Sequence, residues 1–128
     1  MQKKTGVLSS ILYVEDDNIS REIVSMFLKD YFMVDTATES SEAIKKINKN
    51  IYSIILLDMS LCKGLDGLEL AREIKKIKNY KDVPIIAVTA YAFREDENRI
   101  LKNGCTHYIS KPFTKTSLLE KINTALVK

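Results

Sequence analysis

The sequence is poor in the residues that mark several large classes of protein. Its 128 residues include only two cysteines, two prolines and one histidine. Two cysteines provide neither a disulfide framework nor a zinc site. No apolar run approaches the roughly 20 residues that a membrane-spanning helix needs, and the N-terminus lacks the apolar stretch of a secretory signal. We therefore expect a cytoplasmic protein that does not enter the membrane.

The charge of the chain has only a weak bias. The 20 basic and 17 acidic residues leave a net charge of +3, and the 16 lysines are scattered, whereas nucleic-acid binders usually cluster their lysines and arginines. Apolar residues make up 45% and charged residues 29% of the chain, which suits a soluble domain with a packed core. We expect residues 1–128 to form one domain, with its core at about residues 8–126, that does not bind nucleic acid.

Short apolar runs alternate with helical patterns along the chain. The runs cover Val7–Val14, Met33–Ala37, Ser53–Asp58, Pro84–Thr89 and Tyr108–Ile109. Segments with helical character follow each run, at 19–28, 43–47, 68–77, 94–102 and 118–126. This alternation predicts βαβ units and a parallel α/β sheet.

Several residues are candidates for helix ends. Asp17 precedes the first helical segment and is expected to cap it, and Ser40 or Ser41 is expected to cap the second. Asn103 and Gly104 follow the fourth helical segment, where they would form its C-terminal cap.

Polar residues follow the predicted strands where each run ends. Glu15 and Asp16 follow the first run, Asp58 ends the third, Thr89 ends the fourth and Lys111 comes after the fifth. Open α/β sheets bind ligands beyond the carboxyl ends of their strands, where these residues would meet. Three carboxylates in one crevice repel each other, so the cluster needs the counter-charge of a lysine and a cation. Oxygen ligands of this kind suit Mg²⁺, which often shares its coordination with a phosphate.

Five segments together resemble the receiver domain of two-component response regulators. They are Val14-Glu15-Asp16-Asp17, Leu56-Leu57-Asp58, Asp66-Gly67-Leu68-Glu69, Val88-Thr89-Ala90 and Tyr108-Ile109-Ser110-Lys111-Pro112-Phe113. The resemblance covers essentially the whole chain. It implies a flavodoxin-like, doubly wound (βα)5 fold whose parallel strands take the order 2-1-3-4-5.

The resemblance also implies a reaction and a metal site. A phosphoryl group would pass from a phosphohistidine of a histidine kinase or phosphotransfer protein onto Asp58, with Mg²⁺ as cofactor. Asp16 and Asp58 would bind the ion directly, Glu15 would act mainly through water, and the backbone carbonyl of Ser60 would complete the protein ligands. In this reading the chain is a phosphorylation-controlled switch, with only weak self-phosphorylation and self-dephosphorylation.

Three further residues have roles implied by the resemblance. Lys111 would pair with Asp58 and then with the phosphoryl oxygens, and Thr89 would form a hydrogen bond with the phosphoryl group. Movement of Thr89 would let the aromatic switch, Tyr108, turn inward. The surface of the fourth helix, fifth strand and fifth helix would then change and signal to a downstream protein.

The sequence departs from the usual receiver pattern in the loop after Asp58. Position 62 is a cysteine where the family commonly has a proline, and one extra residue separates Asp58 from Asp66. The departure concerns the conformation of the loop, and with it the Ser60 carbonyl, and leaves the acids, Thr89 and Lys111 unchanged. Tyr91 lies two residues past Thr89 and is expected to limit the access of water, giving a long-lived phosphorylated form.

An apolar patch is expected beside the acidic residues. Ile19, together with Pro112 and Phe113, would contact a helical histidine-phosphotransfer partner, whereas Ile23 fits this patch and the core equally well. Little sequence follows the last helix, so we expect output through protein contacts. The chain would be a stand-alone receiver or a piece of a hybrid kinase or larger regulator.

Two other functions use related folds. An aspartate-nucleophile phosphohydrolase needs a second acid two residues after the nucleophile, and this chain has Ser60 there. A flavin-binding module needs a neutral, glycine- and hydroxyl-rich phosphate loop after the first strand. Glu15, Asp16 and Asp17 would repel a phosphate at that place, which makes this alternative the weakest.

Overall fold

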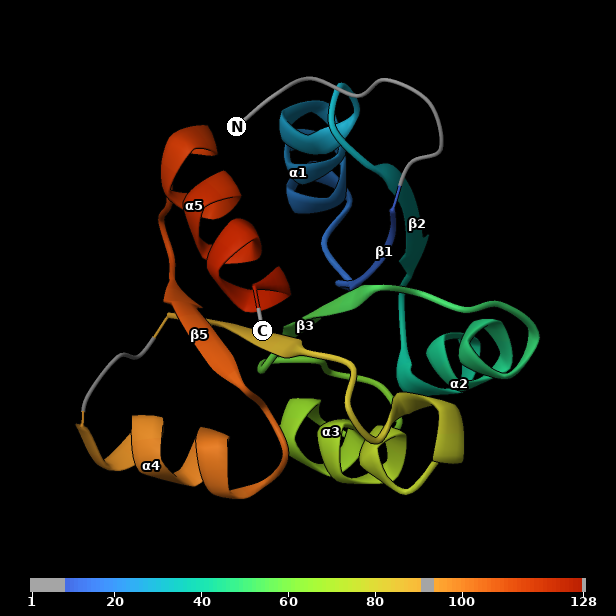
Figure 1. Ribbon diagram of the computed structural model, residues 1–128. Coiled ribbons are helices and arrows are strands. Elements are labelled where there is room, and N and C mark those ends of the chain that lie inside the picture. Colours follow the sequence, from blue (N-terminus) through green and yellow to red (C-terminus); the bar gives the residue numbers. More distant parts are fainter. Residues whose placement is uncertain (1–8, 91–93, 128) are drawn as a thin grey trace.

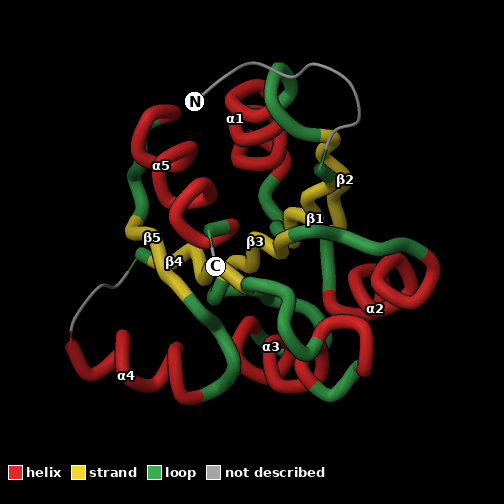
Figure 2. Tube along the Cα trace, in the orientation of Figure 1, coloured by secondary structure: helices red, strands yellow, loops and turns green. Residues whose placement is uncertain are grey.

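The computed structural model describes residues 9–90 and 94–127. In chain order the elements are β1 (Ser10–Val14), α1 (Asn18–Leu28), β2 (Met33–Ala37), α2 (Ser40–Lys49), β3 (Ile54–Asp58), α3 (Gly67–Lys75), the short 3₁₀ helix η1 (Lys78–Tyr80), β4 (Ile85–Thr89), α4 (Arg94–Lys102), β5 (His107–Ser110) and α5 (Lys115–Leu126). All four strand pairings are parallel, and the order is β2-β1-β3-β4-β5 (Figures 1 and 2). This confirms the predicted fold class and strand order.

The sheet has a hydrophobic layer on each face, because successive side chains of a strand point to opposite sides. On β1, Leu12 and Val14 join the layer under α2 and α3, whereas Ile11 and Tyr13 join the layer under α1 and α5. Figure 1 shows these two groups of helices on opposite sides of the sheet. Strands β3 and β4 are buried along their whole length, which explains why their sequences are continuous apolar runs.

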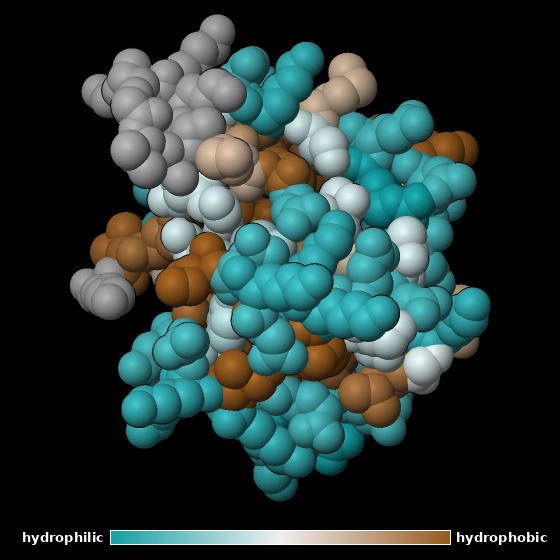
Figure 3. Space-filling model, turned by 90° about the vertical axis from the view of Figure 1, so that its right-hand side faces the viewer, coloured by the Kyte–Doolittle hydropathy of each residue, from teal (hydrophilic) through white to brown (hydrophobic). Residues whose placement is uncertain are grey.

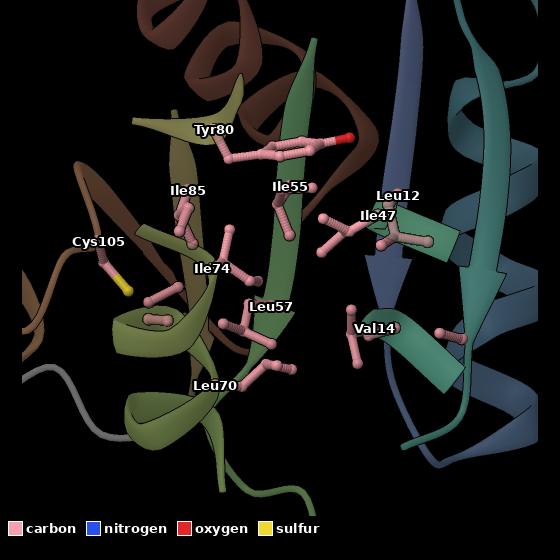
Figure 4. Packing of buried hydrophobic residues seen from close by; sticks show 14 of the residues in the cluster. Leu12, Val14, Ile47, Ile55, Leu57, Leu70, Ile74, Tyr80, Ile85 and Cys105 are labelled. Atoms are coloured by element: carbon pink, nitrogen blue, oxygen red, sulfur yellow. The ribbon is translucent and has the colours of Figure 1, made fainter. Parts of the chain in front are cut away.

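The layer under α2 and α3 holds the β3–α3 region in place. Leu57 of β3 packs with Leu70 and Ile74 of α3, as the close view in Figure 4 shows. All three are fully buried, and burial of each such side chain contributes about 2 kcal/mol. The packing therefore anchors both ends of the loop that follows Asp58.

The helix starts follow the capping rules in part. Asp17 caps α1 as predicted, and its side chain accepts a hydrogen bond from the backbone N–H of Ser20. The prediction that Ser40 or Ser41 caps α2 is wrong, because the cap is Glu39 and both serines lie inside the helix. The hydroxyl of Ser40 instead accepts a hydrogen bond from the backbone N–H of Leu65, 25 residues away.

The C-terminal ends of α3 and α4 show how the chain leaves each helix. Helix α3 ends at Lys75, earlier than the predicted segment 68–77, and the Lys75 ammonium donates to the backbone carbonyls of Tyr80, Lys81 and Val83. Gly104 follows α4 with a φ of 108°, a conformation that glycine adopts at no steric cost. It therefore ends α4 as predicted.

The surface is mixed in character. The view in Figure 3 is mostly hydrophilic, with smaller hydrophobic areas between the charged side chains. Within residues 9–90 and 94–127, no helix has the length and apolar character needed to cross a membrane.

Candidate functional site

The carboxyl ends of four parallel strands bring the polar candidates to one edge of the sheet. Glu15 follows β1, Asp58 ends β3, Thr89 ends β4 and Lys111 follows β5. The register aligns Asp58 with Val88 and Thr89 with Ser110, and the Lys111 N–H donates to the Thr89 carbonyl over 2.7 Å. Residues up to 96 positions apart in the sequence therefore share one site.

Three acidic side chains form a compact cluster at this edge. One carboxylate oxygen each from Glu15, Asp16 and Asp58 lies within 4.8 Å of the other two. Glu15 is 1% exposed and Asp58 2% exposed, whereas Asp16 is open to solvent. The cluster can therefore be reached by an ion from one side. Its oxygen donors fit Mg²⁺, which takes few protein ligands and keeps several waters.

Lys111 supplies a positive charge beside the two buried acids. Its Nζ lies 3.0 Å from Oε1 of Glu15 and 3.6 Å from Oδ2 of Asp58. The Lys111–Pro112 peptide bond is cis. Burial disfavours the charged ammonium, but the two carboxylates outweigh this effect and raise the pKa of Lys111. The lysine is therefore a permanent cation within the cluster.

The two buried acids differ in how readily they ionise. Burial and the adjacent Asp58 raise the pKa of Glu15 to about 7. Burial also opposes ionisation of Asp58, but its hydrogen bonds with Glu15 and Ser60 and the charge of Lys111 hold its pKa below the usual value. Of these two acids, Asp58 therefore carries its negative charge more firmly.

The loop after Asp58 is bound closely to the acidic cluster despite its extra residue. Ser60 donates to Oδ1 of Asp58 from its backbone N–H over 3.1 Å and from its hydroxyl over 3.0 Å. The backbone N–H of Cys62 donates to Oδ2 of Asp16 over 3.2 Å. The Cys62 thiol contacts the Ser60 carbonyl at 3.6 Å, so the carbonyl that we predict to bind metal lies beside a thiol.

Thr89 and Tyr108 take different positions relative to the cluster. Thr89 is buried at the end of β4. Tyr108 is half-buried on β5, and its ring lies 5.7 Å from the ammonium of Lys121 on α5. A hydrogen bond with Glu97 of α4 raises the pKa of its phenol. Tyr108 thus contacts both helices that flank β5. Tyr91 lies outside the described residues.

Two residues at the site were not predicted from the sequence. The phenol of Tyr13 donates to Oε1 of Glu15 over 3.1 Å, and the guanidinium of Arg21 donates to the Glu15 backbone carbonyl over 2.7 Å. The two-residue spacing of Tyr13 and Glu15 puts both on one side of the extended chain, but it does not give the direction of the Tyr13 hydroxyl.

A groove of about 400 Å³ lies next to Lys111, between α1 and the segment after β5. Ile23 and Phe27 of α1 line one side of it, and Pro112 and Phe113 line the other. Ile23 is 45% exposed, and Ile19, one turn nearer the start of α1, is 67% exposed. Apolar residues therefore surround the approach to Lys111, although Ile19 itself does not line the groove.

Comparisons with known proteins agree on one family. Residues 11–123 match the model of the response regulator receiver domain. The polar-differentiation response regulator DivK of Brucella ovis is 31% identical over 118 residues, which cover 91% of this chain and 95% of DivK. The regulatory protein VanRB of Enterococcus faecalis is 34% identical over 117 residues, which cover 91% of this chain and 51% of VanRB.

Solved structures give the same result. The chemotaxis response regulator CheY4 of Vibrio cholerae matches with a TM-score of 0.90 and 27% identity, over 94% of this chain and 100% of that one. The receiver domain of the sensor histidine kinase PA1611 from Pseudomonas aeruginosa, which has a magnesium ion coordinated in its active site cleft, matches with a TM-score of 0.85 and 30% identity, over 94% and 98%. The chain therefore belongs to the response regulator receiver domain family of two-component signalling.

Proposed function

We propose that Asp58 accepts a phosphoryl group from the phosphohistidine of a histidine kinase or phosphotransfer protein, in a Mg²⁺-dependent reaction. The main support is the ammonium of Lys111, which lies 3.6 Å from Asp58 and 3.0 Å from Glu15 inside a cluster of three carboxylates. Such a cluster is stabilised by added positive charge, and a bound Mg²⁺ would supply it beside Lys111, both for the carboxylates and for an incoming phosphoryl group.

The transfer needs no acid or base from the chain. The P–N bond of the phosphohistidine breaks, its electron pair returns to the imidazole, and a P–O bond forms to a carboxylate oxygen of Asp58. Charge spreads over the equatorial oxygens in the transition state, and Lys111 is close enough to neutralise part of it. Mg²⁺ would neutralise another part, held by Asp16, Asp58 and the Ser60 carbonyl directly and by Glu15 through water.

We further propose that phosphorylation is read by Thr89 and Tyr108. The new phosphoryl oxygens are strong acceptors, and the buried Thr89 hydroxyl would form a hydrogen bond with one of them. Tyr108, now near Glu97 and Lys121, would turn inward. The α4–β5–α5 surface would then favour a second arrangement that a downstream protein recognises.

We propose a helical phosphotransfer partner for the apolar surface of Ile19 and the adjacent groove. The groove flanks Lys111, and Ile19 is exposed one turn nearer the start of α1, so a phosphohistidine on a helix bound there would lie near Asp58. The free thiols of Cys62 and Cys105 suit a reducing compartment, and we place the exchange in the cytoplasm.

A turnover enzyme is the less favoured function. Ser60 donates its hydroxyl to Asp58 at the position where an aspartate-nucleophile phosphohydrolase needs an acid. A hydroxyl does not transfer protons readily near neutral pH, so we propose only slow loss of the phosphoryl group.

The direct test is incubation with Mg²⁺ and phosphoramidate, followed by intact mass measurement. We expect the mass to increase by one phosphoryl group. The increase should be absent when Mg²⁺ is left out of the reaction and when Asp58→Asn replaces the wild type. Asp82→Asn is the matched control, because Asp82 is exposed near the opposite ends of the strands. Phosphorylation of Asp58→Asn, or release of phosphate over many turnovers, would overturn the proposal.

The partner surface has a separate test. Ile19→Lys should slow phosphoryl transfer from a phosphorylated histidine-phosphotransfer domain, because a charge replaces the exposed apolar contact. The reaction with phosphoramidate should keep its rate, since this small donor needs no docking surface. Equal effects on both donors would show that Ile19 acts on the site itself.

A further inference from the structure

Tyr13 is a fully buried polar residue in contact with the acidic cluster. It lies on β1, and its ring packs in the hydrophobic layer under α1 and α5, with Val24 and Leu118 among its members. Its hydroxyl donates to Oε1 of Glu15 over 3.1 Å. Burial and the adjacent Glu15 carboxylate raise the pKa of the Tyr13 phenol, so it remains a neutral hydrogen-bond donor.

Besides the hydrogen bond of Glu15 with Asp58, its contacts divide between the two carboxylate oxygens. Oε1 accepts from Tyr13 and from the Lys111 ammonium, at 3.1 and 3.0 Å. Oε2 has the weaker contact, with the backbone N–H of Asp17 at 3.4 Å. Two donors on Oε1 fix the rotation of the carboxylate about its terminal bond, and this leaves Oε2 more free to accept a hydrogen bond from a metal-bound water.

Without the phenol, Lys111 alone would orient Oε1. The lysine side chain is flexible and is shared with Asp58, and phosphorylation would engage it further. The tyrosine ring is held in the core and has no such second task. It is therefore the contact that can keep Glu15 in one orientation before and after phosphoryl transfer.

We propose that Tyr13 is a positioning residue, which orients the Glu15 carboxylate for Mg²⁺ binding. This inference rests on the proposed function, since it assumes that the ion binds at the acidic cluster. Groups that orient metal ligands typically change metal affinity by tenfold or more when they are removed. Because Glu15 would act through water, we expect an effect at the lower end, about tenfold.

The test compares two variants that each remove one buried phenol from one carboxylate. Tyr13→Phe removes the hydrogen bond to Glu15. Tyr52→Phe removes the hydrogen bond to Asp35, whose Oδ2 accepts from the Tyr52 hydroxyl over 2.6 Å on the opposite side of the sheet. The Mg²⁺ Kd of each protein is measured by calorimetry. We expect it to rise about tenfold in Tyr13→Phe and to stay unchanged in Tyr52→Phe.

Two further measurements separate positioning from a general loss of structure. The chain has six tyrosines and no tryptophan, so Mg²⁺ should produce a tyrosine difference spectrum that Tyr13→Phe reduces and Tyr52→Phe retains. In a Glu15→Ala background, which leaves Tyr13 no acceptor at this position, Tyr13→Phe should weaken Mg²⁺ binding by much less than tenfold, because residues that act through one contact are not additive.

The outcomes distinguish the two proposals. If the wild-type protein binds no Mg²⁺, the proposed function fails and this inference fails with it. If the wild type binds Mg²⁺ and Tyr13→Phe has the same Kd, only the role of Tyr13 is overturned. The same conclusion holds if Tyr13→Phe weakens binding by as much in Glu15→Ala as in the wild type.

Discussion

Replacement of Asp58 by asparagine should stabilise the protein when no metal is present. The change keeps the size of the side chain and removes one of three acidic charges that lie within 4.8 Å of one another. It also removes the ion pair with Lys111 at 3.6 Å. The oxygen of an asparagine can still accept the two hydrogen bonds from Ser60. Where Glu15 is also ionised, the sign of the effect therefore depends on two repulsions against one attraction.

The distances between the charged groups set the size of the two repulsions and of the attraction. At an effective dielectric constant of about 20, each repulsion within 4.8 Å amounts to at least about 3.5 kcal/mol and the attraction at 3.6 Å to about 4.6 kcal/mol. The two repulsions therefore exceed the attraction by at least about 2 kcal/mol. Asp16 is exposed and Lys111 half-buried, and solvent screening lowers the expected gain to about 1 kcal/mol.

Urea denaturation at pH 8 measures this difference, because the pKa of about 7 leaves most of Glu15 ionised at that pH. Without metal, Asp58→Asn should have the higher free energy of unfolding. Mg²⁺ at ten times its Kd should then stabilise the wild type by about 1.4 kcal/mol. The variant should gain much less, since it lacks a ligand.

A less stable variant in the absence of metal would refute this reasoning. It would mean that the attraction of Lys111 and the Ser60 hydrogen bonds outweigh the repulsion among the acids. An equal gain from Mg²⁺ in both proteins would show that the ion binds elsewhere. The Asp82→Asn protein serves as the control for any general effect of charge.

Three other substitutions test the packing and hydrogen bonds that support the site. Ile74→Ala should cost about 2–5 kcal/mol of unfolding free energy, because it opens a cavity in the core under α3. Gly67→Ala should cost about 1–3 kcal/mol in thermal or urea unfolding and should weaken Mg²⁺ binding, because a Cβ at residue 67 would lie 2.6 Å from Cα of Met59. Burial opposes ionisation of Asp35, but the hydrogen bonds from Tyr52 and Lys46 lower its pKa. Its stabilising effect should therefore be complete above the unfolded pKa of about 3.9 and lost as the pH falls through the lower folded pKa, a dependence that unfolding curves of Asp35→Asn should lack.

Much of the acidic site could be predicted because it follows from strand direction. In a parallel sheet the residues that end each strand share one edge, so Glu15, Asp58 and Lys111 could be expected together without knowledge of their distances. The two-residue period of β1 and the position of Glu15 could also be recognised in the sequence, and they put Tyr13 on the same side of the strand as Glu15. The hydrogen bond from the Tyr13 hydroxyl to Glu15 could not be recognised, because the pattern gives the side of the strand on which a residue lies and not the direction of its polar atom.

Predictions failed where a distant contact decided the local structure. Ser40 has the sequence context of a helix cap, but its hydroxyl bonds to Leu65, 25 residues further along. The path of the loop with the extra residue was also unpredictable, because the contacts of Cys62 with Asp16 and Ser60 join separate segments. Local preferences are weak compared with such contacts, and they do not reveal which partner will be near.

The 96-residue separation of Glu15 and Lys111 has a consequence for how the protein folds. Pairing of β1 with β3 brings Glu15 and Asp58 together, whereas Lys111 reaches them only through the pairing of β5 with β4. The attraction between the lysine and the two acids therefore favours the addition of β5 to the sheet. Long-range contacts of this kind slow folding, and they also make the chemistry of the site available only when β5 has joined.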